Sequence, residues 1–209
     1  MFRAFLPLRE GWIFIGPLGG GVLFTVLKGW WFLFIPLAVL TMMAFIFFRN
    51  PPRHPPEVES AVISPADGRI ITVERLRTDE AGWKVSIFMS VWDVHVNRSP
   101  VDATVKERQH RKGRFFPAYR PEASERNEQN KLVLETSQGK SLTVVQVAGI
   151  LARRILCRVG PGDSLRRGQV FGAIILGSRV DLYLPEEAEL SIKVGDRVKA
   201  GESLIGFLR

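Results

Sequence analysis

The sequence is poor in the residues that build cross-links and metal sites. Cys157 is the single cysteine among 209 residues, so the chain cannot form an internal disulfide. Histidine occurs three times, at His54, His95 and His110, which are well separated along the chain. The sequence lacks zinc-finger spacing, basic-region helices and the aromatic strands of RNA-binding domains. We therefore expect no bound metal and no nucleic-acid partner.

Acidic side chains are too few to balance the basic ones. The chain carries 29 lysine and arginine residues against 21 aspartate and glutamate residues, a formal net charge of +8. Such an excess predicts an anionic partner. Because nucleic-acid motifs are missing, a membrane surface is favoured over DNA or RNA. The length suits one domain with an appendage.

Charge is missing altogether from residues 12–27 and 29–48, which Lys28 separates. As a helix, the second segment is long enough to cross a bilayer core of roughly 30 Å, whereas the first, about 24 Å long, is marginal. No small-residue cleavage site follows, which argues against a signal peptide. We therefore predict a membrane-anchoring hydrophobic hairpin over residues 1–48, with Lys28 near its tip. A buried helical pair in a soluble protein is the alternative.

Arginines flank both outer ends of this predicted hairpin, at Arg3, Arg9, Arg49 and Arg53. The positive-inside rule then places both ends on the cytoplasmic side. We expect the protein at the inner membrane of the cell, with its folded domain in the cytoplasm. Whether the hairpin spans the bilayer or only enters it is left open.

The rest of the chain predicts a mainly β fold. Residues 49–60 contain four prolines and read as a linker. From residue 61 to 209, short strand-like segments alternate with turns rich in Gly, Pro, Asp and Asn, which is typical of a sandwich or barrel. The segments are residues 61–65, 69–76, 83–90, 103–109, 131–137, 142–149 and 154–159. Polar residues 121–130 predict a short helix or a loop.

A weak internal repeat marks the last third of the chain. The sequence GDSLRRGQ at residues 162–169 matches GDRVKAGE at residues 195–202. Each copy reads as a turn in which glycine takes a positive φ before an apolar strand. Paired turns of this kind resemble those of biotinyl and lipoyl domains, so we expect a barrel-sandwich-like domain behind the hairpin.

Between the two copies, the segment ILGSRVDLYLP at residues 175–185 is interrupted at Gly177-Ser178. His95 ends an apolar strand-like segment, and Asp67 lies in an Asp-Gly turn. On its own, each is read equally well as a structural histidine or a turn aspartate. Together with Ser178 they supply the nucleophile, base and orienting carboxylate of a nucleophilic site.

Five segments together resemble a phosphatidylserine decarboxylase proenzyme of the short bacterial or archaeal type. They are FFRNPPR (47–53), SPADGRI (64–70), FMSVWDVHVNRSP (88–100), LGSRVDLYLP (176–185) and VGDRVKAGESLIGFL (194–208). The resemblance runs from about residue 45 to the C-terminus. It implies that the protein cuts its own chain between Gly177 and Ser178, giving chains 1–177 and 178–209.

The resemblance also implies a covalent cofactor. Ser178 would become a pyruvoyl group, whose ketone condenses with the substrate amine and accepts the electrons released as CO2 departs. The reaction would convert phosphatidylserine to phosphatidylethanolamine and CO2, a step of phospholipid biosynthesis. By match to the family's segments, His95 would protonate the product carbanion, and Asp67 would orient the imidazole during self-cleavage.

One position departs from the longer members of the family, which carry a second histidine three positions after the first. Arg98 stands there in this sequence. The self-cleavage base is therefore either His95 or Asp67, and Arg98 becomes a candidate ligand for a substrate carboxylate or phosphate. Arg111, Lys112 and Arg114 are further candidates for lipid contact, with Phe115 and Phe116 beside them.

Two other classes of protein remain at this point. A membrane-anchored lipoyl-like carrier would need a modifiable lysine at the tip of residues 175–181, which hold none, and an adaptor would need heptads, which are also missing. A membrane serine hydrolase would keep Ser178 intact inside one chain. The sequence leaves formation of a homo-oligomer open.

Overall fold

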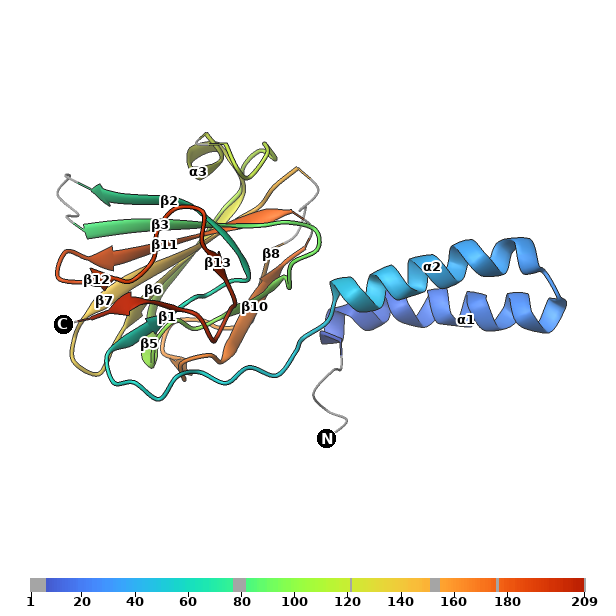
Figure 1. The fold of residues 1–209 in the computed structure, drawn as a ribbon, viewed down its shortest axis with the longest axis horizontal. Helices are drawn as coiled ribbons and strands as arrows, with labels where there is room; N and C mark the ends of the chain where they lie inside the picture. Colours follow the sequence, from blue (N-terminus) through green and yellow to red (C-terminus); the bar gives the residue numbers. More distant parts are fainter. Residues whose placement is uncertain (1–6, 77–81, 121, 151–154, 176, 209) are drawn as a thin grey trace. The chain divides into compact units, whose positions relative to one another are not determined.

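A computed structural model describes residues 7–208, except for residues 77–81, 121, 151–154 and 176. It divides into two compact units, residues 1–52 and residues 53–209. The first is helical and the second is mainly β, as Figure 1 shows. The expected fold class, a β domain behind an N-terminal helical hairpin, is confirmed.

The N-terminal unit is a helical hairpin. A 3₁₀ turn at Arg9–Gly11 leads into α1 (Trp12–Lys28), and α2 (Trp31–Phe47) returns beside it. Gly29 ends α1 in the left-handed conformation, with φ at 66°, which glycine adopts without a Cβ clash. Trp12, at the start of α1, packs edge-on against Phe45, near the end of α2, so the helices are antiparallel. Lys28 thus borders the turn, as predicted.

The relative lengths of the two helices differ from the sequence-based prediction. The helix Arg9–Lys28, 20 residues long, is sufficiently long and apolar to cross a membrane by length and composition. Trp31–Phe47 is shorter, at 17 residues. The reason is local, since the 3₁₀ turn lengthens the first helix and the turn at the hairpin tip takes residues 29 and 30 from the second.

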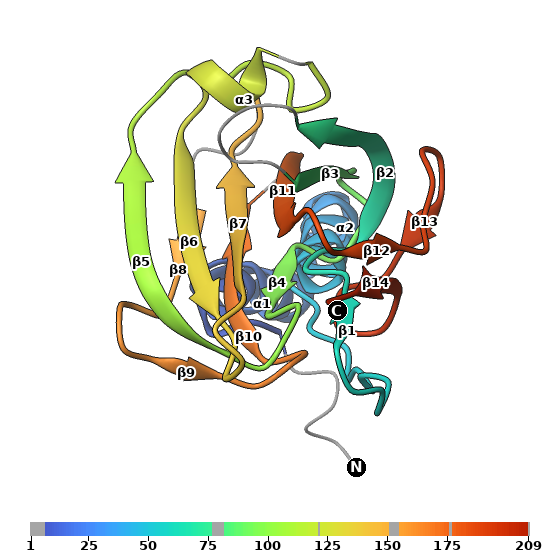
Figure 2. The same ribbon diagram turned by 90° about the vertical axis from the view of Figure 1, so that its left-hand side faces the viewer.

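One large antiparallel sheet dominates the second unit. Its strand order is β13-β2-β3-β11-β7-β6-β5-β9. The bounds are β2 (Gly68–Leu76), β3 (Gly82–Met89), β5 (Ala103–Arg111), β6 (Gln129–Glu135), β7 (Ser141–Val147), β9 (Ser164–Leu165), β11 (Ser178–Pro185) and β13 (Arg197–Val198). The polar segment after β5 forms only the short helix α3 (Ala123–Arg126). Figure 2 shows the sheet curling from β5 round to β2.

Two three-stranded sheets complete the domain. One has the order β1-β14-β12 and the other β4-β10-β8. Their bounds are β1 (Ala61–Ile63), β4 (Val96–Arg98), β8 (Ile155–Cys157), β10 (Val170–Ile174), β12 (Glu189–Leu190) and β14 (Leu204–Phe207). A single buried cluster joins them to the large sheet through Phe171, Ile205 and Leu182, among others. Each strand-like segment of the sequence forms a strand, so those predictions are confirmed.

The repeated turns contain β9 and β13, the two outermost strands of the large sheet. β9, in the first copy, pairs with the start of β5, and β13, in the second, pairs with the start of β2. Gly162 and Gly195 have φ of 92° and 99°, as the repeat predicted. The amide of Gly162 donates to Val105, and that of Gly195 donates to Ile70 in the same way. The copies are thus equivalent in structure.

A row of paired residues crosses the large sheet near the ends of its strands and marks the side on which these strands begin or end. Gln129 faces Val147, Val147 faces Arg179, and Arg179 faces Phe88 in successive strands. Because these residues end β3 and β7 and begin β6 and β11, the connections there leave the sheet on the same side. We call this side the Ser178 edge, since β11 begins at Ser178.

Candidate active site

The Gly177-Ser178 bond lies where the chain enters a central strand. Ser178 is fully buried, and its backbone faces Met89 of β3. Its hydroxyl donates to the Met89 sulfur at 3.4 Å, and a thioether is a weak acceptor. Gly177 has φ at 57°, a left-handed conformation that favours glycine. The hydroxyl is thus held in the interior beside a turn that suits glycine.

His95 lies against the same bond. Its Nε2 accepts a hydrogen bond from the backbone N–H of Gly177 at 3.3 Å. This assignment places the lone pair of the imidazole at Nε2, facing the Gly177-Ser178 segment. His95 is 2% exposed, and its carbonyl accepts from the amide of Ile174 in β10. Two predicted site residues, 82 positions apart along the chain, are therefore neighbours in space.

The carbonyl of Gly177 is approached by a second glycine, which the sequence did not reveal. A Cβ atom on Gly149 would lie 1.9 Å from the Gly177 oxygen and 3.3 Å from the Cβ of Ala118. Contacts that short do not occur between nonbonded atoms, so only glycine allows this approach. The backbone after β7 is therefore packed directly on the carbonyl that self-cleavage would attack.

Asp67 directly precedes β2, which β3 separates from β11. Arg69 of β2 and Arg179 of β11 both pair with Phe88 of β3, so Asp67 also lies at the Ser178 edge. One carboxylate oxygen accepts from the Arg53 guanidinium at 2.7 Å, and the other accepts from the Ala200 amide at 2.7 Å. Burial raises the pKa of Asp67, while Arg53 and the Ala200 N–H oppose that rise.

The hydrogen bonds described for Asp67 therefore run to Arg53 and Ala200. Direct orientation of His95 by Asp67 stays a prediction. The sequence analysis placed Arg53 in the linker and did not predict that it pairs with Asp67. The available signal was that Arg53 ends FFRNPPR, one of the segments that carry the family resemblance.

Arg98 lies three residues beyond His95, about 10 Å along an extended chain. Its guanidinium donates to the carbonyl of Gly168 at 2.9 Å. Burial, and the neighbouring charge of Arg53, lower the pKa of Arg98. Arg98 thus lies among Arg53, Asp67 and Glu202, and its assignment to a substrate anion stays a prediction.

The three other basic candidates lie at the end of β5, where Arg111 is the last residue of the strand and Lys112 and Arg114 follow it. Arg111 donates to the carbonyl of Glu125, and Arg114 forms a backbone bridge with Asn127. Lys112 is exposed between them. Phe115 is 37% exposed beside this group. These residues lie at the edge where β11 begins, and their contact with lipid stays a prediction.

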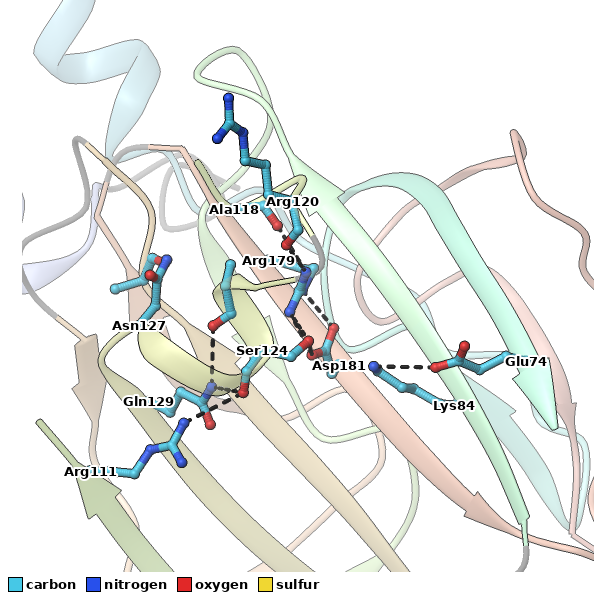
Figure 3. A network of polar contacts seen from close by, with 12 residues as sticks. Glu74, Lys84, Arg111, Ala118, Arg120, Ser124, Asn127, Gln129, Arg179 and Asp181 are labelled. Carbon is cyan, nitrogen blue, oxygen red and sulfur yellow. Dashed lines mark hydrogen bonds and ion pairs between the residues drawn. The ribbon is translucent and has the colours of Figure 1, made fainter. Parts of the chain in front are cut away.

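The sequence analysis did not predict a buried polar network on β11, next to Ser178. Arg179 and Asp181, 3% and 1% exposed, form an ion pair on the outer face of β11. Arg179 also donates to the Ser124 hydroxyl and to the carbonyls of Ala118 and Arg120 (Figure 3). It therefore fixes the segment before α3 onto the strand that Ser178 begins. In the sequence, Arg179 and Asp181 alternate with apolar residues as in a strand with one face in water, so nothing in the pattern shows that they are buried.

Comparison with known proteins agrees with this geometry. The family model described as phosphatidylserine decarboxylase matches residues 40–206. Three similar proteins are each named phosphatidylserine decarboxylase proenzyme. The protein of Geotalea uraniireducens is 45% identical over 202 residues, covering 95% of each chain. That of Nitrosomonas eutropha is 41% identical over 204 residues, covering 96% of this chain and 94% of its own.

The third, from Neisseria gonorrhoeae, is 44% identical over 204 residues, which are 96% of this chain and 78% of that one. The match thus extends over nearly all of the present sequence, including Ser178, which begins β11, and His95, which precedes β4 rather than ending a strand as expected. The chain belongs to the phosphatidylserine decarboxylase family and is a decarboxylase, a carbon–carbon lyase.

Proposed function

We propose that this protein cleaves itself between Gly177 and Ser178, converts Ser178 to a pyruvoyl group and then decarboxylates phosphatidylserine to phosphatidylethanolamine. The observation that carries the proposal is the contact between His95 Nε2 and the Gly177 amide, 3.3 Å apart, beside the buried Ser178. The imidazole of His95 and the hydroxyl of Ser178 thus both lie at the Gly177-Ser178 peptide bond, whose glycine has a left-handed conformation.

In the cleavage, the Ser178 oxygen attacks the Gly177 carbonyl carbon and gives its proton to a base. The carbon–nitrogen bond breaks, the nitrogen of residue 178 takes a proton back from the base, and Gly177 becomes an ester on the serine oxygen. Loss of the Cα proton of residue 178 then expels the Gly177 carboxylate and leaves dehydroalanine, which water converts to a pyruvoyl group and ammonia. His95 is suited to accept the first proton, since its Nε2 lone pair faces this segment.

The strand pairing next to Ser178 would keep a pyruvoyl group at position 178 in place through repeated turnovers. After cleavage, the backbone of Arg179 stays paired with Phe88 on one side and Val147 on the other. The pyruvoyl group supplies a ketone beside a carbonyl, which together accept the electrons released with CO2. His95 would return a proton to the substrate carbon, and its burial excludes competing water.

A pair of histidine variants tests this proposal. His95→Ala should abolish CO2 release from phosphatidylserine, because the positioned acid is lost. His110→Ala is the matched control, since its side chain is 42% exposed and contacts Glu128 instead. Phosphatidylglycerol, which has no amine, is the control lipid. Full turnover by a cleaved His95→Ala protein would remove His95 from the mechanism, and its cleaved fraction shows whether His95 also serves the first step.

The membrane arrangement belongs to the same proposal. The apolar helix Arg9–Lys28 supports membrane association by its length and composition. We place residues 1–48 in the membrane as an anchoring hairpin, residues 49–60 as a linker and residues 61–209 on the cytoplasmic side. A cysteine at position 28 should then react with impermeant reagents from outside the cell, while a cysteine in residues 50–60 should not. Labelling of the linker from outside would contradict this topology.

A further inference from the structure

The connections at the Ser178 edge carry exposed apolar side chains, which loop tips rarely do. Trp92 follows β3 and is 69% exposed, Tyr119 lies between β5 and β6 and is 60% exposed, and Ile150 follows β7 and is 53% exposed. We call these three residues the apolar rim. Val91 and Phe115 are exposed beside them. The rim thus draws on three separate connections that leave the sheet on one side.

The opposite edge of the sheet differs. Its described turns, Thr136–Lys140 and Glu186–Ala188, hold no exposed large apolar side chain. Among the described residues of this domain, only Val58 and Val194 are exposed large apolar residues outside the rim and its neighbours Val91 and Phe115, so most of the apolar exposure gathers on one side. Single exposed apolar residues scattered over a surface would need no explanation. The segregation coincides with the edge at which Ser178 begins β11.

Buried and partly buried polar groups hold the rim in place. Asp93 accepts from both the amide and the hydroxyl of Ser90, which closes the turn that presents Trp92. Arg179 binds the carbonyls of Ala118 and Arg120, the residues on either side of Tyr119 (Figure 3). The rim is therefore a preformed surface, and little conformational entropy would be lost when it binds.

The third rim segment is tied to the second. Asn127 donates from its amide nitrogen to the carbonyls of Phe116 and Ala148, which precede Tyr119 and Ile150 in their loops. The ring of Tyr119 also packs edge-on against Phe88, with 6.1 Å between centroids. These bonds link the loops around the Ser178 edge to one another.

Charge identifies what the rim fits. Residues 111–126 carry five basic side chains against two acidic ones. At the far edge, residues 136–140 and 186–188 carry one basic and two acidic side chains. Exposed tryptophan and tyrosine beside a basic segment suit the interface of a bilayer that contains anionic lipid. A charged partner protein alone would not require apolar side chains on three projecting tips.

We propose that the apolar rim docks the Ser178 edge onto the surface of an anionic bilayer. This inference rests on the proposed function, since a lipid amine and carboxylate must reach the buried Ser178 from that edge. Only residues 49–52 separate Phe48 from Arg53, so a hairpin held in a bilayer tethers the catalytic domain at its surface. The rim then decides which face meets the lipid.

Site-specific labelling of the full-length protein in anionic nanodiscs tests the docking. Single cysteines at positions 92, 119 and 150, in a Cys157→Ser background, carry an environment-sensitive fluorophore. Each rim label should shift to the blue and be quenched by a nitroxide on the lipid acyl chains. Val194→Cys is the matched control, an apolar residue of the same domain that is 58% exposed outside the rim. Gln138→Cys reports the far edge. Neither should shift.

Two results would overturn the inference, namely rim labels that remain in water while the hairpin is inserted, or equal shifts at Val194 and Gln138. Chain cleavage and CO2 release are measured on the same samples. If the labels stay in water while the enzyme is cleaved and active, the docking fails and the proposed function stands. If the labels shift in a protein that is neither cleaved nor active, the proposed function fails instead.

Discussion

Asp67 and Asp102 hold equivalent places in two copies of one turn. Asp67 accepts from the amide of Ala200 at 2.7 Å, and Asp102 accepts from the amide of Arg167 at 3.0 Å. Ala200 and Arg167 are themselves equivalent positions of the repeated turn. The copies differ in surroundings, since Asp67 is buried against Arg53 whereas Asp102 is exposed. The backbone bond is thus a feature of the fold, and burial against Arg53 distinguishes Asp67.

This equivalence separates a structural role of Asp67 from a chemical one. Asp102→Ala removes one bond to a backbone amide and should lower the free energy of unfolding by about 1 kcal/mol. Asp67→Ala removes the equivalent bond and also the ion pair with the buried Arg53, so its loss of stability should be larger. Only Asp67→Ala should also stall self-cleavage. The measurements are thermal unfolding and the cleaved fraction by gel. Equal cleavage in the two variants would show that Asp67 serves the turn alone.

The pH dependence of cleavage should report the Arg53–Asp67 pair. Burial raises the pKa of Asp67 and Arg53 opposes the rise, so Arg53→Met should raise that pKa further. If the carboxylate form serves cleavage, the acidic limb of the rate profile then moves to higher pH. Ionised Asp67 also costs more stability in the variant, a loss present at neutral pH and relieved as pH falls through the folded pKa.

Glu202→Gln is the control for that experiment. Glu202 is the other partner of Arg53, at 3.1 Å, and its removal leaves the Arg53 charge beside Asp67. The acidic limb should not move upward in this variant. An unchanged limb in Arg53→Met would mean that Asp67 does not titrate in the cleavage step.

Gly149→Ala should slow self-cleavage. The added Cβ would lie 1.9 Å from the Gly177 oxygen, so the carbonyl under attack must shift. A displacement of about 1 Å in a reacting group costs on the order of 100-fold in rate. Gly160→Ala is the matched control, since a Cβ there meets no atom within 4 Å. Time courses of chain separation give both rates, and cleavage of Gly149→Ala at the rate of the control would contradict the prediction.

The ion pair behind Ser178 predicts a stability pattern. Arg179→Ala leaves the Asp181 carboxylate buried without its partner, and such a change costs about 3–5 kcal/mol. The double variant Arg179→Met/Asp181→Leu removes both charges and should be more stable than the single variant. Chemical denaturation measures both. A double variant less stable than Arg179→Ala would show that the bonds to Ala118 and Ser124, not charge pairing, dominate.

The sequence predicted the longer strands because alternation and turn residues bound them on both sides. It missed β9, β12 and β13, each only two residues long, since no periodicity can register over so few positions. The sequence analysis identified the repeated glycine turns but not the two segments that bond to them, Ser-Pro-Ala-Asp at residues 64–67 and Ser-Pro-Val-Asp at residues 99–102. That second repeat was visible and would have paired Asp67 with Asp102.

Site residues with a reactive side chain could be predicted from the sequence. Residues that contribute to the site through packing could not. Ser178 and His95 stood out by residue type and neighbouring sequence, and the structure brings them to one bond. Gly149 resembles any loop glycine, because its approach to Gly177 exists only after folding. Arg179 belonged to an alternating strand whose polar face should meet water, yet the segment before α3 covers it.

The intact mass of the denatured protein tests the central claim most directly. We predict two chains without added protease, residues 1–177 and residues 178–209, and the small chain should lack a free α-amine and react with hydrazine-type reagents. Ser178→Ala should remain one chain of 209 residues without decarboxylase activity, because alanine can neither attack nor eliminate. A single unmodified chain of full mass with decarboxylase activity would contradict the account.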